Sequence, residues 1–80
     1  MTKEEFAKKL KELKFTKVTS VNGAKGFNTT ITLESGKSFD VTCFAAPDMK
    51  SKRALDCAWD MMLRNLAEHF GYKGDLTSFH

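Results

Sequence analysis

The sequence predicts an α+β domain with the element order helix, strand, strand, strand, helix. Two amphipathic helical patterns flank a central stretch in which apolar and polar residues alternate, as in half-buried strands. The connections between the three predicted strands are short, which favours an antiparallel meander. We therefore expect a three-stranded antiparallel sheet with both helices packed on its apolar face and its polar face open to water.

The length and the charge bound the class of protein. The 80 residues correspond to one domain, so we expect a single domain spanning residues 1–80. With 41% hydrophobic residues, the chain is too apolar for a disordered protein. The net charge of +3 permits nucleic-acid binding without requiring it. We expect no secretory signal and no membrane span, and therefore a cytoplasmic protein without a membrane partner.

A first helix is predicted from about residue 2 to residue 14. Thr2 and Glu5 have the T-x-x-E spacing of a capping box, in which each side chain binds the other residue's free backbone N–H. Phe6 and Leu10 belong to a narrow apolar stripe at helical spacing. Lysines gather towards the C-terminal end, where the helix dipole favours cations, so we interpret them first as a solvated face and second as phosphate contacts.

Three strands are predicted over about residues 15–21, 27–34 and 37–43. The first is rich in β-branched residues but alternates imperfectly, which is typical of an edge strand. In the other two, most alternate residues are apolar, with Thr29 the exception among the inward-facing positions, and the residues between them are mostly threonine, serine, asparagine or acidic. Glycines in the connections, residues 22–26 and 35–36, permit the positive φ of tight turns.

A long helix predicted from about residue 50 to residue 70 is the element around which the domain is organised. Its apolar side chains fall on one broad face, which is wide enough to cover a small sheet. Asp48 is the candidate N-cap, with Ser51 as the alternative, and Gly71 is expected to end the helix. Residues 71–80 form a short tail whose two large apolar side chains indicate contact with the body of the domain or with a partner.

Three cations lie at the start of this long helix, namely Lys50, Lys52 and Arg53. The helix dipole is positive there and disfavours each cation by about 0.3–1 kcal/mol, so stability alone would favour aspartate or glutamate. Free backbone N–H groups and side-chain charges that converge at a helix start are suited to an anion. We therefore interpret the cluster, together with Lys25 in the first hairpin loop, as contacts to nucleic-acid phosphates. The alternative is scattered solubilising charge.

A second candidate surface consists of Ala54, Cys57 and Met61. They recur at helical spacing, and we expect them opposite the main apolar face of the long helix. A helix that only covers a core would be polar there, so an exposed methionine indicates contact with another protein or with a second copy of the chain, as a homodimer. The alternative is an incidental mixed surface.

The sequence contains no catalytic or metal-binding pattern, and we predict a non-enzymatic protein without a cofactor or a metal. It has no glycine-rich phosphate loop, no H-E-x-x-H and no C-x-x-C. Cys57 and His69 stand on one predicted helix about 18 Å apart by helical rise, which is too far for a catalytic pair. Cys43 and Cys57 are expected to be buried thiols rather than a disulfide.

The element order and two local motifs resemble the double-stranded RNA-binding domain. Ser51-Lys52-Arg53 resembles the basic start of that family's second helix, and Phe27 to Lys37 resembles its F-x-x-x-V-x-V-x-x-G-K strand and turn. The resemblance implies phosphate contacts from the helix start across the RNA major groove, and minor-groove contacts from the first helix and the first hairpin loop. This chain differs in lacking the G-P-x-H loop motif and in having Asp56 at the position of the last lysine.

We therefore expect a small nucleic-acid-binding domain, with structured or double-stranded RNA favoured over DNA. The alternative is a small inhibitor or antitoxin of the kind that phages encode, which binds and blocks a host protein such as a nuclease. In that case Met61, the polar face of the sheet and the tail would form the contact. A fold of this size carries either function, so the residues at the site have to decide between them.

Overall fold

The structure has the α-β-β-β-α order that the sequence predicts. The computed structural model describes residues 1–79, and for Ser51 the backbone alone. The elements are helix α1 (Lys3–Glu12), strands β1 (Thr16–Thr19), β2 (Lys25–Thr32) and β3 (Ser38–Phe44), helix α2 (Ser51–Phe70) and a 3-10 turn η1 (Thr77–Phe79). The strands pair antiparallel in the order β1-β2-β3, so β2 is central. The predicted α+β class and three-stranded sheet are confirmed.

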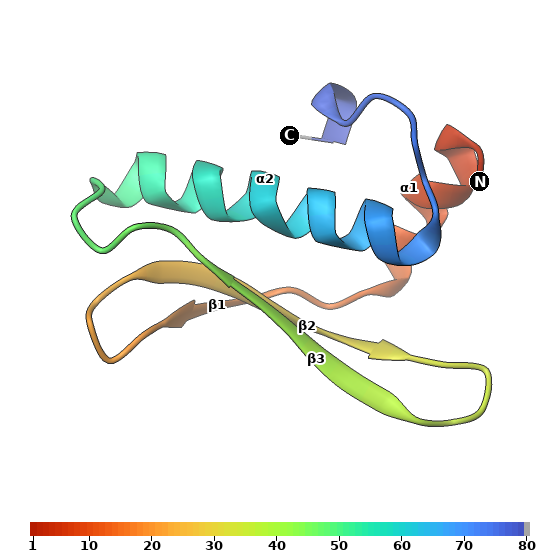
Figure 1. Ribbon diagram of the computed structural model, residues 1–80, viewed down its shortest axis with the longest axis horizontal. Coiled ribbons are helices and arrows are strands. Elements are labelled where there is room, and N and C mark those ends of the chain that lie inside the picture. The colour runs from red at the N-terminus through yellow and green to blue at the C-terminus, as the bar shows by residue number, and fades with distance from the viewer. Residues whose placement is uncertain (80) are drawn as a thin grey trace.

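The molecule has two layers, with the sheet below and the helices above (Figure 1). Helix α2 runs across one face of the sheet, and α1 lies beside its C-terminal end on the same side (Figure 1). Phe6 of α1 belongs to the same buried cluster as Ile31 of β2 and Met62 and Leu66 of α2. The apolar face of the sheet is therefore covered mainly by α2, and α1 closes one end of the core.

An aromatic cluster ties the tail to the helices. The ring of Phe6 is fully buried and stacks on Tyr72, with 4.6 Å between ring centroids. Phe79 meets the same ring edge-on at 5.2 Å, and its carbonyl oxygen accepts a 2.9 Å hydrogen bond from Trp59 Nε1. The segment after α2 therefore folds back on the body of the domain as far as it is described; His80 lies outside the described residues.

The two ends of α2 are built differently. Gly71 ends the helix with a φ of 78°, as predicted, and its N–H binds the carbonyl of Ala67. At the start, neither Asp48 nor Ser51 is the N-cap; Lys50 takes that position and makes no side-chain cap bond. The prediction failed because the chain remains irregular for two residues beyond Asp48. The first backbone N–H groups of α2 therefore lack the side-chain acceptor that a capped helix has.

The first hairpin turns two residues earlier than predicted. Ser20 N donates to the Ala24 carbonyl oxygen at 2.9 Å, and Ser20 Oγ accepts from the backbone N–H groups of Asn22 and Ala24. Gly23 supplies the positive φ of 84°. Because the connection spans residues 20–24 and not 22–26, β1 ends and β2 begins earlier than expected. Lys25 therefore lies in β2, and its placement in the loop is corrected.

Gly26 lies in β2 where β3 is too close to leave room for a side chain. Its partner across the ladder is Phe44. A Cβ atom at Gly26 would collide with the carbonyl oxygen of Cys43 and with the Phe44 ring, 2.8 Å away. Backbone on one side and an aromatic ring on the other leave no room to adjust, so this position requires glycine.

We expect Gly26→Ala to lower the free energy of unfolding by more than about 2 kcal/mol, because a strand has to shift to relieve the collision. Urea denaturation monitored by Trp59 fluorescence measures the loss. The control is Gly36→Asn in the β2–β3 turn, where φ is 87° and a Cβ would meet no atom within 4 Å. Asparagine tolerates the left-handed region, so the control should cost less than about 1 kcal/mol. Equal losses for the two variants would contradict the packing described here.

The predicted capping box is present at the start of α1. Thr2 N donates to Glu5 Oε1 at 3.2 Å, and Thr2 Oγ1 accepts from Glu5 N at 3.2 Å. The hydrogen bond from the Thr2 backbone lowers the pKa of Glu5, and a bond from the Thr2 side chain lowers it further. A lowered pKa means that the folded state is stabilised above the pH at which glutamate titrates in the unfolded chain. That stabilisation disappears as the pH falls through the folded-state pKa.

We expect Glu5→Gln to destabilise the protein at pH 7 and to match the wild type in acid, where Glu5 of the wild type is protonated. Unfolding curves collected at a series of pH values measure this difference. The control is Glu4→Gln, which removes a neighbouring carboxylate of the first turn that takes no part in the capping box. If the two variants lose the same stability at every pH, the hydrogen bonds to Thr2 give the charge of Glu5 no advantage over that of Glu4.

Candidate nucleic-acid interface

The three cations at the start of α2 are accessible and unneutralised. Lys50, Lys52 and Arg53 are all exposed, and none forms an ion pair with a residue that the structure describes. The first turn of α2 contains no acidic residue. The acid of α2 that does pair, Asp60, binds Arg64 at 3.0 Å further along the helix. Cationic side chains and uncapped N–H groups therefore meet at one end of α2, an arrangement suited to an anion.

Lys25 lies at the same end of the molecule. Side chains of alternate strand residues share a face, so Lys25 shares the α2-facing side of β2 with Phe27. Its carbonyl oxygen accepts a 2.9 Å hydrogen bond from the N–H of Ala45. Ala45 packs against Ala54 and Ala58, in the N-terminal half of α2. The half-buried Lys25 therefore emerges beside the basic helix start, and the β1–β2 turn and that start lie at one end of the domain (Figure 1).

A further cation, Lys17, belongs to this basic end and was missed from the sequence. Lys17 is paired with Phe27 across the β1–β2 ladder, so its exposed side chain is on the α2-facing side as well. The imperfect alternation of the first strand concealed this. The sequence did contain a signal, the aromatic Phe15 two residues earlier, because residues two apart in a strand share a face. In the structure the Phe15 ring contacts Trp59 of α2 at 4.8 Å.

Asp56 contributes the opposite charge near the same end. It is exposed and follows Lys52 by one helical turn, yet it forms no ion pair with it. The Asp56 carboxylate therefore lowers the positive potential along this flank but does not pair with Lys52. The strongest positive field is therefore expected over the first turn of α2 itself, where Lys50, Lys52 and Arg53 lie.

The second candidate surface differs from its prediction. Ala54 is 1% exposed and packs against Ala45 and Ala58, so it belongs to the core and does not lie opposite it. Cys57 is half-buried against the same alanines, whereas Met61 is 38% exposed. The error arose because the large residues of α2 were taken to mark the centre of its buried face, whereas small alanines do so near its start. Cys57 and Met61 therefore line one flank of α2.

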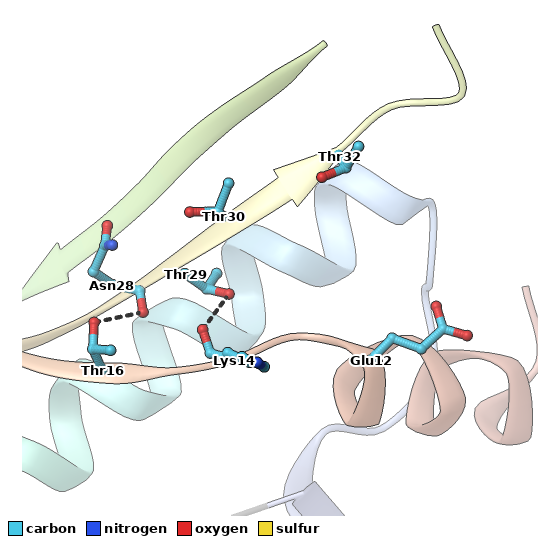
Figure 2. A pocket seen from close by; sticks show the side chains of 7 residues that line it. All are labelled: Glu12, Lys14, Thr16, Asn28, Thr29, Thr30 and Thr32. Carbon is cyan, nitrogen blue, oxygen red and sulfur yellow. Dashed lines mark hydrogen bonds between the residues drawn. The ribbon is translucent and has the colours of Figure 1, made fainter. Parts of the chain in front are cut away.

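A polar hollow of about 380 Å³ lies beside β2, where the chain leaving α1 has not yet joined the sheet (Figure 2). Its lining is Glu12, Lys14, Thr16, Asn28, Thr29, Thr30 and Thr32. The Thr29 hydroxyl is buried and donates to the Lys14 carbonyl oxygen at 3.0 Å, which holds this connection against β2 (Figure 2). One acid and one lysine balance each other there, so the hollow offers hydroxyl groups rather than net charge.

Other chemical groups are few in the described part of the chain. Cys43 is buried, Cys57 is half-buried, and both are free thiols. Among residues 1–79, no three histidine, cysteine, aspartate or glutamate side chains come together in a way that could hold a metal ion. None of the described helices has the length and apolar character needed to cross a membrane. The basic end is therefore the most distinctive chemical feature of the described surface.

The observed topology agrees with the resemblance to the double-stranded RNA-binding domain at the level of element order and sheet pairing. Both depend on the fold alone, and many functions share one fold. Comparisons of this chain with protein-family models, with curated proteins and with solved structures find no match.

Proposed function

We propose that this domain binds structured or double-stranded RNA through its basic end, with Lys50, Lys52, Arg53 and Lys25 contacting phosphates. The observation that carries the proposal is the start of α2, where three exposed cations form no ion pair with a described residue and the N-cap Lys50 makes no side-chain cap bond. A phosphate bound there would receive backbone N–H groups and side-chain charge together.

The energetics of the free protein support an anionic ligand. Each cation in the first turn opposes the helix dipole by about 0.3–1 kcal/mol, and no capping side chain offsets that cost. A phosphate reverses the sign of the interaction, because both the dipole and the cations attract it. An anion is therefore expected to bind more favourably at this end of the protein than at scattered surface lysines.

The preference for RNA over DNA comes from the resemblance in topology and in the basic helix start. In that family the first helix supplies a second contact region. Here α1 carries exposed lysines and lies towards the other end of α2 (Figure 1), within a molecule whose longest dimension is 36 Å. Two separated contact regions suit a ligand that is itself long and regularly charged, as a duplex is.

The test is a binding titration with an RNA duplex of about 20 base pairs and with a DNA duplex of the same sequence. Four phosphate contacts predict a loss of affinity of roughly 100-fold between about 50 mM and about 200 mM salt. The double variant Lys52→Glu/Arg53→Glu should weaken RNA binding by more than about tenfold at the lower salt, because both side chains then repel phosphate.

The matched control for that variant is Lys37→Glu/Lys73→Glu. It makes the same change in net charge at two exposed lysines distant in sequence from the basic end. If the control weakens binding equally, bulk charge and not the basic end explains the affinity. Absence of RNA binding by the wild type at about 50 mM salt would overturn the proposed function.

A second candidate function, binding and blocking a host protein such as a nuclease, is favoured by one observation. Met61 is 38% exposed on the flank of α2 that borders the sheet edge, and Cys57 lies half-buried one turn before it. A pull-down from a host lysate, with and without nuclease treatment, separates the two functions. Capture that survives nuclease treatment favours a protein partner, and capture that requires nucleic acid favours the RNA proposal.

A further inference from the structure

Strand β3 is an unpaired edge over its full length. The sheet order β1-β2-β3 places it at one side, and its seven residues, Ser38–Phe44, pair with β2 alone. The tail and the segment before β1 pack on the other flank of α2, where Trp59 contacts Phe15 and binds the Phe79 carbonyl oxygen. In the described part of the chain, α2 packs on one face of β3, and no segment pairs with its outer edge.

The hydrogen-bond pattern shows which backbone groups are free. Ala45 N donates to the Lys25 carbonyl oxygen, and Leu33 N donates to the Lys37 carbonyl oxygen. In an antiparallel ladder, residues that bond to one neighbour alternate with residues that face away from it. The odd-numbered residues of β3 therefore face β2, and the even-numbered residues direct their N–H and C=O groups outward. The outward groups belong to Ser38, Asp40, Thr42 and Phe44.

This edge lacks the features that usually prevent strand addition. Natural edge strands carry lysine or proline, contain a bulge, or are covered by another segment. β3 contains no lysine and no proline, and its register with β2 is uninterrupted from Phe44 to Ser38. Its one charged residue, Asp40, accepts a 2.7 Å hydrogen bond from Thr30 on the outer face of the sheet, and its backbone remains open.

A groove with ordered walls runs between this edge and α2. It has a volume of about 540 Å³ and is lined by Asp40, Val41, Thr42, Asn65, Glu68 and His69. Asn65 Nδ2 is fixed by bonds to the Met61 carbonyl oxygen at 3.0 Å and to Cys43 Sγ at 3.1 Å. The His69 ring packs on Phe39, which is 39% exposed.

The charge of the groove selects its occupant. The charged residues that line it, Asp40 and Glu68, are both acidic, although the whole protein has a net charge of +3. A second copy added edge to edge about Val41 would bring the two Asp40 and two Glu68 carboxylates towards one another, which opposes self-association. A segment with basic side chains would instead neutralise them.

We propose that the free edge of β3 and this flank of α2 bind an extended, lysine- or arginine-bearing segment of another protein, which adds to the sheet as a fourth strand. Its backbone pairs with the outward groups of Asp40 and Thr42. Its side chains alternate between the two faces of the sheet. Basic residues reach Asp40 on the outer face and Glu68 on the helix face, and apolar residues cover Met61 and Phe39.

This site is separate from the proposed RNA site. The basic end involves the start of α2 and Lys25, whereas the groove involves the second half of α2 and β3. Variants at one surface leave the other intact, so failure of one proposal does not imply failure of the other.

The experiment measures fluorescence anisotropy of a labelled peptide in which pairs of lysines alternate with pairs of valines, so that each face of the added strand carries both residue types. An otherwise identical peptide with glutamate in place of lysine serves for comparison. Thr42→Pro removes an outward N–H that β2 does not use, and proline is tolerated at such edge positions. The control is Thr42→Val, which keeps the N–H and loses the same 2.6 Å bond to Asn28 Oδ1. We expect wild type and Thr42→Val to bind the lysine peptide alike, and Thr42→Pro to bind it at least about tenfold more weakly.

A charge reversal tests the same site without altering a strand. Glu68 is exposed on α2, so Glu68→Lys should leave the fold intact, weaken binding of the lysine peptide and strengthen binding of the glutamate peptide. RNA binding should be unchanged in Thr42→Pro. The proposal is overturned if the wild type binds neither peptide or both alike, or if Thr42→Pro and Thr42→Val bind alike. It is also overturned if the wild type is a dimer that Thr42→Pro dissociates, because the edge then receives a second copy.

Discussion

Close packing of α2 on the end of the sheet is the constraint on which both candidate surfaces depend. Ala45 after β3 contacts Ala54 and Ala58 of α2, and all three are buried. Alanines allow a helix to approach a strand more closely than leucine or phenylalanine does. The larger buried residues, including Met62 and Leu66, follow in the second half of the helix. The small residues therefore hold the uncapped start of α2 close to the end of the sheet where Lys25 emerges.

The same arrangement divides the surface of the domain. Phe6, Tyr72 and Phe79 gather α1 and the tail at one end and one flank of α2, where they complete the core. What remains open is the start of α2 and its other flank along β3. Neither opening is a by-product of missing apolar residues, because two buried clusters lie beneath the helix and the half-buried Phe27 packs against both. The unprotected features are a charged helix start and an unpaired strand, and both are structures that other molecules can complete.

Local signals in the sequence predicted local features well. The capping box at Thr2, the glycine end of α2 at Gly71 and the order of elements all depend on neighbouring residues, and the structure contains them. Two local predictions were wrong, the N-cap of α2 and the bounds of the first hairpin. The other errors concern contacts between distant segments. Whether Ala54 is buried depends on where α2 rests on the sheet, and that follows from Ala45 rather than from helical periodicity. In a four-residue strand such as β1, pairing with β2 likewise decides which side chains face α2. This is why Lys17 was overlooked.

The two candidate surfaces stabilise one folded state through different elements. An anion at the start of α2 would relieve the opposition between its cations and the helix dipole, whereas a strand added to β3 would extend the sheet beneath the same helix. A domain of this size buries only about 60–65% of its unfolded surface, so part of either ligand's binding energy appears as stability of the fold. Coupling between two ligands requires that each bind two arrangements of a shared element with different affinity. Because both surfaces use α2 in the position that its alanines impose, binding at one is expected to leave the intrinsic affinity of the other unchanged.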